Sequence, residues 1–434
     1  MTISQFQVGV FLKKNKIMKR KKICIIGGGI TGCTLAKILS KFHKVTIFER
    51  KPNLGGILEE YKKKNNFFLR GCQYIDFESP IVKFMSKKEL NEFYVFNQKY
   101  FSYNKFNNQE LFSKNYAVPV FFLDKDKLKK IKTSKKSKRN NLNEKIEEYP
   151  DFISLNLKKF YLKLGLNLEE LTFENCFNFQ TGKVGFINHI DKIKELKNKS
   201  KLLDDLYAIP RKKLDDKLIT KSILPKKGFN TFFKNFENNY SKKIRIIKKS
   251  NIRPKWDLNN LKIINNSEIT NFDKIVWTGN PTYLIKEFNG NKLNSIPTKI
   301  LQISADVVSS NKNNYFGQFY SDELEILRVF IYKLNKTKKI NIECIPKIKD
   351  EKKVASNACK ILSKYGVDIK INFETLSSFL DVRFNLISTN DKQIIENFNK
   401  KTIKTNLLNS PWTLYGRDQK LNYYIEKLKR EKLL

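Results

Sequence analysis

The stretch that decides the fold is KICIIGGGITGCTLAKILSKFHKVTIFE, residues 22–49. It opens with an apolar run at 23–26, which predicts a short buried strand. Apolar residues then recur at helical spacing over 31–41, and the run at 45–48 predicts a second strand. A strand, a helix and a strand in this order begin a doubly wound parallel sheet. We therefore expect an α/β fold.

The turn between the first strand and the helix reads G-x-G-x-x-G. We expect Gly27 to allow the tight turn, Gly29 to let the backbone approach a pyrophosphate, and Gly32 to let the helix pack closely on the strand. Ile30 and Thr31 open the helix, whose free N–H groups and positive dipole end suit phosphate oxygens. The turn predicts a dinucleotide site. The alternative is a glycine-rich turn in some other α/β protein.

Glu49 ends the second strand, 22 residues after Gly27, where a carboxylate accepts hydrogen bonds from a ribose hydroxyl. Arg50 follows, and a glycine pair begins six residues after Glu49 at Gly55 and Gly56. This resembles the E-x-x-x-x-x-G-G extension of flavoproteins with two dinucleotide-binding domains, such as flavin amine oxidases, protoporphyrinogen oxidase, phytoene desaturases and UDP-galactopyranose mutase. In those families the glycine pair passes beside the ribityl and phosphate part of FAD. The resemblance therefore implies a Rossmann-type fold and FAD as the cofactor.

Four later segments resemble UDP-galactopyranose mutase in order and spacing. They are LPKKGFNTF at 224–232, FDKIVWTGNP at 272–281, LRV at 327–329, and YGR at 415–417 followed by LNYYI at 421–425. In that family the N5 atom of a reduced flavin is the nucleophile that interconverts the pyranose and furanose rings of UDP-galactose. The resemblance implies that Arg328 and Tyr423 contact the substrate's diphosphate. It also implies that Gly416 and Arg417 lie against the flavin.

One motif departs from the mutase pattern. The family's G-P-H-I-F-H corresponds to GCQYID at 71–76, so the histidine beside the flavin becomes Gln73. The arginine of the family's mobile loop has no good match, although Arg211 is near in sequence. These departures leave open an altered chemistry, a different sugar, or an oxidoreductase of the wider amine oxidase group. Taken alone, Arg328 also fits an ordinary strand arginine, Tyr423 a packing residue and Gln73 a buried hydrogen-bonding residue.

The chain carries 85 lysines and arginines against 43 acidic residues, a formal net charge of +42. A nucleic-acid or anionic-lipid surface is one explanation. Only 11 of the basic residues are arginine, whereas lysine, asparagine, isoleucine and phenylalanine abound, as A/T-rich codons favour. We therefore expect no specific nucleic-acid partner and a small-molecule substrate, a nucleotide sugar first, with a homodimer left open.

Six scattered cysteines and two histidines provide no metal-ligand pattern, so we expect no metal and a reducing, cytoplasmic location. No apolar run is long enough to span a bilayer. The residues at 1–17 place their apolar run before the lysines, the reverse of a signal peptide, and we expect a disordered tail or an overlong gene assignment.

The predicted architecture is a Rossmann-type FAD domain in three parts, at 21–80, 221–290 and 406–434. The range 1–20 is a tail. A mostly helical substrate region with a lysine-rich loop at 125–141 fills 81–220, and a substrate-domain sheet and helix fill 291–405, together an inserted α+β domain. Three functions remain open: a mutase-like isomerase, an FAD-dependent oxidoreductase of the amine oxidase or desaturase type, and a basic binding protein on a Rossmann scaffold.

Overall fold

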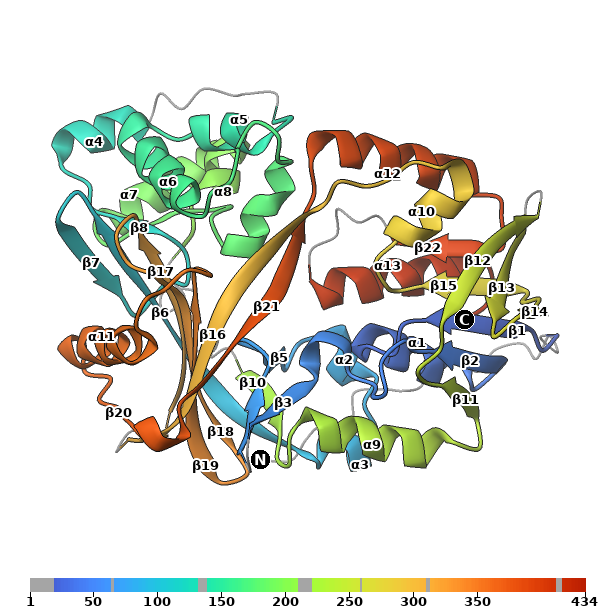
Figure 1. Ribbon diagram of the computed structural model, residues 1–434. Coiled ribbons are helices and arrows are strands. Elements are labelled where there is room, and N and C mark those ends of the chain that lie inside the picture. The colour runs from blue at the N-terminus through green and yellow to red at the C-terminus, as the bar shows by residue number, and fades with distance from the viewer. Residues whose placement is uncertain are drawn as a thin grey trace.

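The computed structural model describes residues 19–63, 66–131, 139–209, 221–257, 260–309, 313–410 and 416–434. Two large sheets dominate these ranges, and helices pack on their faces (Figure 1). The five-stranded sheet lies on the right of this view, and the ten-stranded sheet lies on the left and in the centre.

The five-stranded sheet has the order β11-β2-β1-β15-β22, and all its neighbouring strands are parallel. Its strands are β1 (Lys22–Ile26), β2 (Lys44–Phe48), β11 (Ile244–Ile247), β15 (Lys274–Trp277) and β22 (Leu407–Asn409). They come from three stretches that are far apart in the sequence. Helices cover both faces of this sheet, and the predicted α/β class is confirmed.

The ten-stranded sheet is mixed and contains the longest strands of the chain. Its members are β5 (Ile75–Asp76), β6 (Phe93–Phe106), β7 (Gln109–Ser113), β10 (Lys221–Pro225), β16 (Ile296–Val308), β17 (Asn314–Ser321), β18 (Ile326–Leu334), β19 (Thr337–Cys344), β20 (Lys370–Ile371) and β21 (Ser377–Leu386). The smaller sheets are β3 (Glu60–Lys63) with β4 (Asn66–Leu69), β8 (Val120–Phe121) with β9 (Gly185–Phe186), and β12 (Ile252–Asp257), β13 (Asn260–Asn265) and β14 (Glu268–Thr270).

Three groups of helices surround the sheets. Those nearest the five-stranded sheet are α1 (Ile30–Leu39), α2 (Pro80–Lys83), α3 (Lys87–Leu90), α9 (Phe229–Tyr240), α10 (Thr282–Asn289), α12 (Thr389–Thr402) and α13 (Arg417–Arg430). A helical lobe contains α4 (Lys125–Lys130), α5 (Leu142–Glu147), α6 (Asp151–Lys163), η3 (Phe173–Phe179), α7 (Ile190–Lys199) and α8 (Lys201–Leu206). The ten-stranded sheet packs against α11 (Glu351–Lys364), and the short turns are η1 (Gly56–Leu58) and η5 (Phe373–Thr375).

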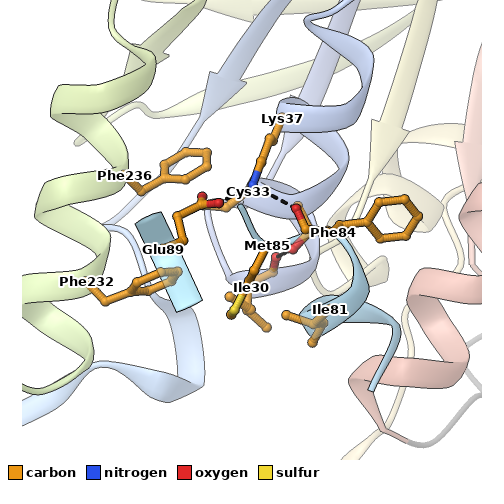
Figure 2. Close-up of a pocket in the computed structure, with 10 residues that line it drawn as sticks. Ile30, Cys33, Lys37, Ile81, Phe84, Met85, Glu89, Phe232 and Phe236 are labelled. Carbon is orange, nitrogen blue, oxygen red and sulfur yellow. Dashed lines mark hydrogen bonds and ion pairs between the residues drawn. The ribbon is translucent and has the colours of Figure 1, made fainter. Parts of the chain in front are cut away.

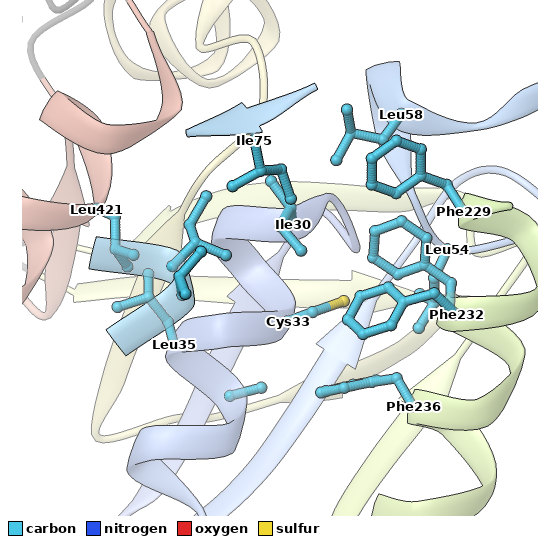
Figure 3. Close-up of a cluster of buried hydrophobic side chains, with 14 of the residues drawn as sticks. Ile30, Cys33, Leu35, Leu54, Leu58, Ile75, Phe229, Phe232, Phe236 and Leu421 are labelled. Atoms are coloured by element: carbon cyan, nitrogen blue, oxygen red, sulfur yellow. The ribbon is translucent and has the colours of Figure 1, made fainter. Parts of the chain in front are cut away.

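The alternation of β1 places its side chains in two different cores. Ile23 and Ile25 face a cluster shared with α1, α9 and α13, whereas Cys24 and Ile26 face the cluster on the opposite side. Figure 3 shows the first of these clusters, with Leu35 of α1 near Leu421 of α13. A strand buried on both faces needs a continuous apolar run, which explains why this strand was recognisable in the sequence.

Helices are the main elements in the described part of 81–220, and this region also contains the 14-residue strand β6. The start of the stretch 125–141, expected to be a loop, is helix α4, capped by the Asp124 carboxylate on Lys127 N at 2.8 Å. The charged segment after Asp191 forms α7 and α8 and buries Lys197, whose ammonium pairs with Asp204 at 2.7 Å. Within the described ranges, no helix has both the length and the apolar character needed to cross a membrane.

Candidate dinucleotide site and the polar row beside it

The turn between β1 and α1 requires glycine at two positions. Gly27 has a φ of +105°, and its N–H donates to the Phe48 carbonyl oxygen at 2.9 Å. A Cβ atom on Gly27 would lie 2.7 Å from Thr278 Oγ1. A Cβ atom on Gly32 would overlap the carbonyl oxygen of Gly27. The turn therefore closes tightly and lets α1 start directly against the end of β1.

Gly29 differs from its neighbours because a Cβ atom there would meet no atom within 4 Å. Gly29 is the N-cap of α1, and no side chain caps this helix. The first turn of α1 has no acidic residue. The N–H groups of Ile30, Thr31 and Gly32 precede the first intrahelical bond, which runs from Cys33 N to Gly29 O at 2.9 Å. Open space beside Gly29 and a positive helix end suit a phosphate.

Glu49 is buried beside this turn. Its Oε2 atom accepts from Gly28 N at 2.7 Å and its Oε1 atom accepts from Lys51 N at 2.8 Å. Each carboxylate oxygen has a second lone pair, so Glu49 can hold the turn and still accept a bond from a ribose hydroxyl. The neighbouring Arg50 is exposed.

The glycine pair lies directly against the first turn. Gly55 and Gly56 have φ angles of +124° and +60°. Gly55 N donates to the Gly28 carbonyl at 2.9 Å, and a Cβ atom on Gly56 would lie 3.2 Å from Gly29 Cα. Two segments that are 27 residues apart thus meet at Gly29. Together with Glu49 and the N-terminus of α1, they form a cradle that fits the adenosine and diphosphate parts of a dinucleotide.

A small cavity lies where α1 meets α2, α3 and α9. Figure 2 shows Lys37 and Glu89 pointing toward each other across it, and Lys37 also donates to the Phe84 carbonyl at 2.7 Å. Glu89 is the N3 residue of the capping box that begins at Ser86. This buried ion pair fixes the position of α1 relative to α3.

The N-terminus of α13 is fastened to the segment that contains Gln73. Gly416 has a φ of +84° and precedes the helix. The guanidinium of Arg417 donates to the Tyr74 carbonyl oxygen, and Asp418 accepts from Ser79 Oγ at 2.6 Å. The Gln73 carbonyl oxygen accepts from Arg417 in one orientation of the amide (3.3 Å) and from Arg383 in the other (2.8 Å). The structure thus brings Gln73 and Arg417 together.

Arg328 belongs to a row of four buried polar side chains that crosses the ten-stranded sheet. The row runs from Gln318 on β17 through Arg328 on β18 and Glu343 on β19 to Gln302 on β16. Each of these residues is the register partner of the next. Arg328 Nε donates to Gln318 Oε1 at 3.1 Å, and Arg328 Nη1 lies 3.4 Å from Glu343 Oε2. A third bond runs from Arg328 to the carbonyl oxygen of Asn178 in η3. The row therefore links the sheet to the helical lobe.

The other end of this row reaches the loop before Gln73. Glu343 Oε1 accepts from Cys72 N at 3.0 Å and lies 3.2 Å from Arg383 Nε on β21. Burial alone would raise the pKa of Glu343, but Arg383 and Arg328 outweigh it and hold that pKa below its usual value. Gln302 accepts from the N–H of Gly71. Gln302, Gln318, Glu343 and Arg383 were missed in the sequence, because single polar residues on strands become a cluster only once the register is known.

Tyr423 does not join this cluster. It is partly buried against the α1 core, and the Lys427 ammonium lies 5.7 Å from the centroid of its ring. No recorded contact among the described residues links it to Arg328 or Gln73. The buried tyrosine of α13 is Tyr424, which donates to the Trp277 carbonyl and accepts from Ser410 N at 3.1 Å. Arg211 and the tyrosine of the YGR motif, Tyr415, lie outside the described residues.

Comparison with known proteins finds a family match in the same segment. Residues 25–86 match the family model of the NAD(P)-binding Rossmann-like domain. A 4,4'-diapophytoene desaturase (4,4'-diaponeurosporene-forming) of Staphylococcus aureus is 45% identical over 51 residues, which are 12% of this chain and 10% of that enzyme. The match thus spans about a tenth of the length of such relatives.

Similarity over nearly the whole chain appears in the comparison of three-dimensional structures. The solved structure of reduced UDP-galactopyranose mutase has a TM-score of 0.65 at 10% identity and covers 94% of this chain and 95% of its own. The putative protoporphyrinogen oxidase from Exiguobacterium sp. 255-15 has a TM-score of 0.53 at 9% identity. The match covers 95% of this chain and 99% of that protein. At these identities the likeness shows a shared fold: a Rossmann-type dinucleotide-binding sheet joined to a second, mixed sheet.

Proposed function

We propose that this chain binds FAD at the turn between β1 and α1 and acts as a flavoenzyme on a small-molecule substrate. The observation that carries the proposal is the open, uncapped N-terminus of α1, with Glu49 and the Gly55–Gly56 pair packed around it. A glycine pair at this position favours FAD over a nicotinamide cofactor by its resemblance to the flavoprotein extension.

In this proposal each part of the cradle has one task. The N–H groups of Ile30 and Thr31 bind phosphate oxygens, and Gly29 leaves room for them. Glu49 accepts from the adenosine ribose. Arg417, held by the Tyr74 carbonyl, contacts the ring end of the cofactor. Bound FAD would supply the redox or nucleophilic ring chemistry, and the side chains bind and orient the substrate beside it.

For the reaction we propose first a mutase-like ring isomerisation of a nucleotide sugar. Arg328 supports it, because its planar guanidinium is already fixed by Gln318, Glu343 and the Asn178 carbonyl and is therefore a preorganised cation. Arg383, on the opposite side of Glu343, adds a second guanidinium to the same cluster. Tyr423 would have to reach the diphosphate from the surface of α13.

An oxidoreductase is the second candidate, and Gln73 favours it. A glutamine amide donates and accepts hydrogen bonds but does not exchange a proton near neutral pH, unlike the histidine that the mutase motif has at this position. The desaturase that shares the 45% identical segment is, by its name, an enzyme of this second class.

The six cysteines are all free, and they support the proposal of a reducing, cytoplasmic location.

One assay separates the two candidates. Protein loaded with FAD and reduced by dithionite is mixed with UDP-galactopyranose and, separately, with UDP-galactofuranose. The first proposal predicts interconversion of the two, and Arg328→Lys, which keeps the charge but loses the fork, should reduce the rate by at least about tenfold. No interconversion, together with anaerobic bleaching of oxidised flavin by an amine or an unsaturated substrate, would replace the first candidate with the second.

A further inference from the structure

A second, smaller cavity lies where the ten-stranded sheet meets the helical lobe. Its apolar walls come from α6, η3, β16 and β18, and its polar lining comes from the row that crosses the sheet. The lining residues are Phe160, Phe179, Ile300, Leu327, Gln318, Arg328 and Glu343. The cavity admits about one water-sized group.

Gln318 is the unusual member of this lining. It is 2% exposed, and its Oε1 atom is used by Arg328 Nε at 3.1 Å. Its Nε2 atom is buried and has no hydrogen-bond partner among the described residues. Buried amide groups in folded proteins are nearly always paired, so an unused donor on a residue that lines a cavity points to an acceptor that enters the cavity.

Glu343 supplies the opposite polarity in the same cavity. Arg328 and Arg383 hold its pKa below the usual value, and within the described part of the chain its Oε2 atom has the 3.4 Å contact with Arg328 as its hydrogen bond. A carboxylate accepts hydrogen bonds and donates none. The occupant must therefore accept a bond from Gln318 and donate one to Glu343.

A hydroxyl group meets these requirements. A phosphate is too large and too strongly charged for a cavity with four apolar walls, and a carbonyl or ether oxygen has no proton to donate. We propose that the Gln318 cavity is a site for a single O–H group, a hydroxyl of the substrate when substrate is bound and a water molecule otherwise. This inference rests on the proposed small-molecule substrate. It favours a sugar or another alcohol over an unsaturated hydrocarbon.

Two variants separate a donor role for Gln318 from a role in holding Arg328. Gln318→Glu keeps an oxygen for Arg328 Nε and replaces the unused donor with an acceptor. Gln318→Met has a similar shape and loses both groups. Thermal melting and FAD binding first establish that each variant folds. If the amide donates to a substrate hydroxyl, both variants should bind UDP-galactopyranose at least about tenfold more weakly than the wild type. Wild-type affinity in Gln318→Glu, with loss only in Gln318→Met, would show that Gln318 merely positions Arg328 and would overturn the inference.

Crystals of the FAD-loaded protein test the site without assuming a substrate. Without sugar, we expect an ordered oxygen about 2.7–3.2 Å from Gln318 Nε2. A dry cavity, or an Nε2 atom bonded to another protein group, would overturn the inference. With UDP-galactopyranose bound, a sugar hydroxyl should replace that water. If the sugar binds elsewhere and the water stays, the cavity holds a structural water only. That result would overturn the inference that the cavity binds a substrate hydroxyl. If the wild type does not bind UDP-galactopyranose, the mutase proposal fails, and the sugar-free crystal still decides whether the oxygen site exists.

Discussion

Gly29 and Gly32 lie three residues apart in one turn, yet a side chain at each would meet different surroundings. A Cβ atom on Gly29 points into open space, whereas a Cβ atom on Gly32 overlaps the Gly27 carbonyl. The first position is free for a ligand, and the second is filled by the fold itself. Substitutions at these two glycines therefore test two different properties, ligand binding at Gly29 and folding stability at Gly32.

Gly29→Ala should bind FAD at least about tenfold more weakly and unfold with nearly the wild-type free energy, within about 0.5 kcal/mol. The reason is that the added methyl group occupies the space proposed for the pyrophosphate and touches no protein atom. Gly32→Ala is the matched control and should lower the free energy of unfolding by about 1–3 kcal/mol through overpacking. Fluorescence titration with FAD and urea denaturation measure both effects. Wild-type FAD affinity in Gly29→Ala would show that the phosphates do not bind at this turn.

Glu60 is a buried carboxylate that caps a helix far away in the sequence. Its Oε1 atom accepts from Phe229 N at 3.0 Å and its Oε2 atom lies 3.4 Å from Asn230 N, at the start of α9. Burial raises its pKa to about 7, although these N–H groups and Lys339 oppose the shift. The segment that follows the glycine pair is thus anchored by a group that titrates near neutral pH.

Because the folded state binds this proton more tightly than the unfolded state, Glu60 stabilises the fold below about pH 4.5. That contribution is lost as the pH rises toward and through about 7. Glu60→Gln keeps one acceptor for Phe229 N and cannot ionise. Its free energy of unfolding should therefore exceed that of the wild type above pH 7, by up to about 3 kcal/mol, and match it near pH 4.5. Urea denaturation at several pH values measures this. A variant less stable than the wild type at pH 8 would show that the ionised cap is favourable.

At the scale of elements, α13 carries two adjacent tyrosines in different environments. The hydroxyl of Tyr424 joins α13 to β15 and to the end of β22 through Trp277 and Ser410, whereas Tyr423 lies at the edge of the core. The sequence resemblance selects Tyr423 for substrate binding. The structure gives Tyr424 the packing role.

Tyr424→Phe should lower the free energy of unfolding by about 1–3 kcal/mol, because it leaves the Ser410 N–H and the Trp277 carbonyl without their partner. Tyr423→Phe should change it by less than about 0.5 kcal/mol. In the reaction assay Tyr423→Phe should instead slow turnover if its hydroxyl contacts the substrate. Equal destabilisation by both variants would mean that Tyr423 is a packing residue and remove it from the proposed site.

Strands with a continuous run of apolar residues were predictable from sequence. A strand whose buried residues include polar ones was not. The predicted strands at 23–26 and 45–48 both exist, because parallel strands covered on both faces are largely apolar. Strand β6 was missed because polar residues such as Gln98 and Asn104 are buried in it, which breaks the apolar run. Helix α7 lies in the region expected to be mostly helical, although only Ile193 and Lys197 of its ten residues are buried.

The candidate site was predictable only where it is local in sequence. The turn at Gly27–Gly32, Glu49 and the glycine pair follow one another within 30 residues, so spacing alone identified them. Arg383 and Gln73 are 310 residues apart and meet only because β21 pairs with β16 and passes the loop at 71–73. Such a meeting depends on the tertiary arrangement and leaves no mark in local sequence.

At the scale of the whole molecule, the formal net charge of +42 should make the fold sensitive to salt. Raising NaCl from about 0.01 M to about 0.15 M shortens the Debye length from about 30 Å to about 8 Å and screens the repulsion among exposed lysines. We therefore expect the melting temperature to rise over this range. Differential scanning calorimetry of the apo protein measures it. A constant or falling melting temperature would mean that local ion pairs already balance the charge.

The central claim is that this chain is an FAD-binding protein, and equilibrium titration with FAD tests it most directly. The purified protein is titrated with FAD, and visible absorbance, flavin fluorescence and melting temperature are followed together. The account predicts one FAD per chain, a perturbed flavin spectrum, and stabilisation by about 2.7 kcal/mol at a free FAD concentration 100 times the Kd. A protein that stays colourless, with an unchanged flavin spectrum and melting temperature, would contradict it.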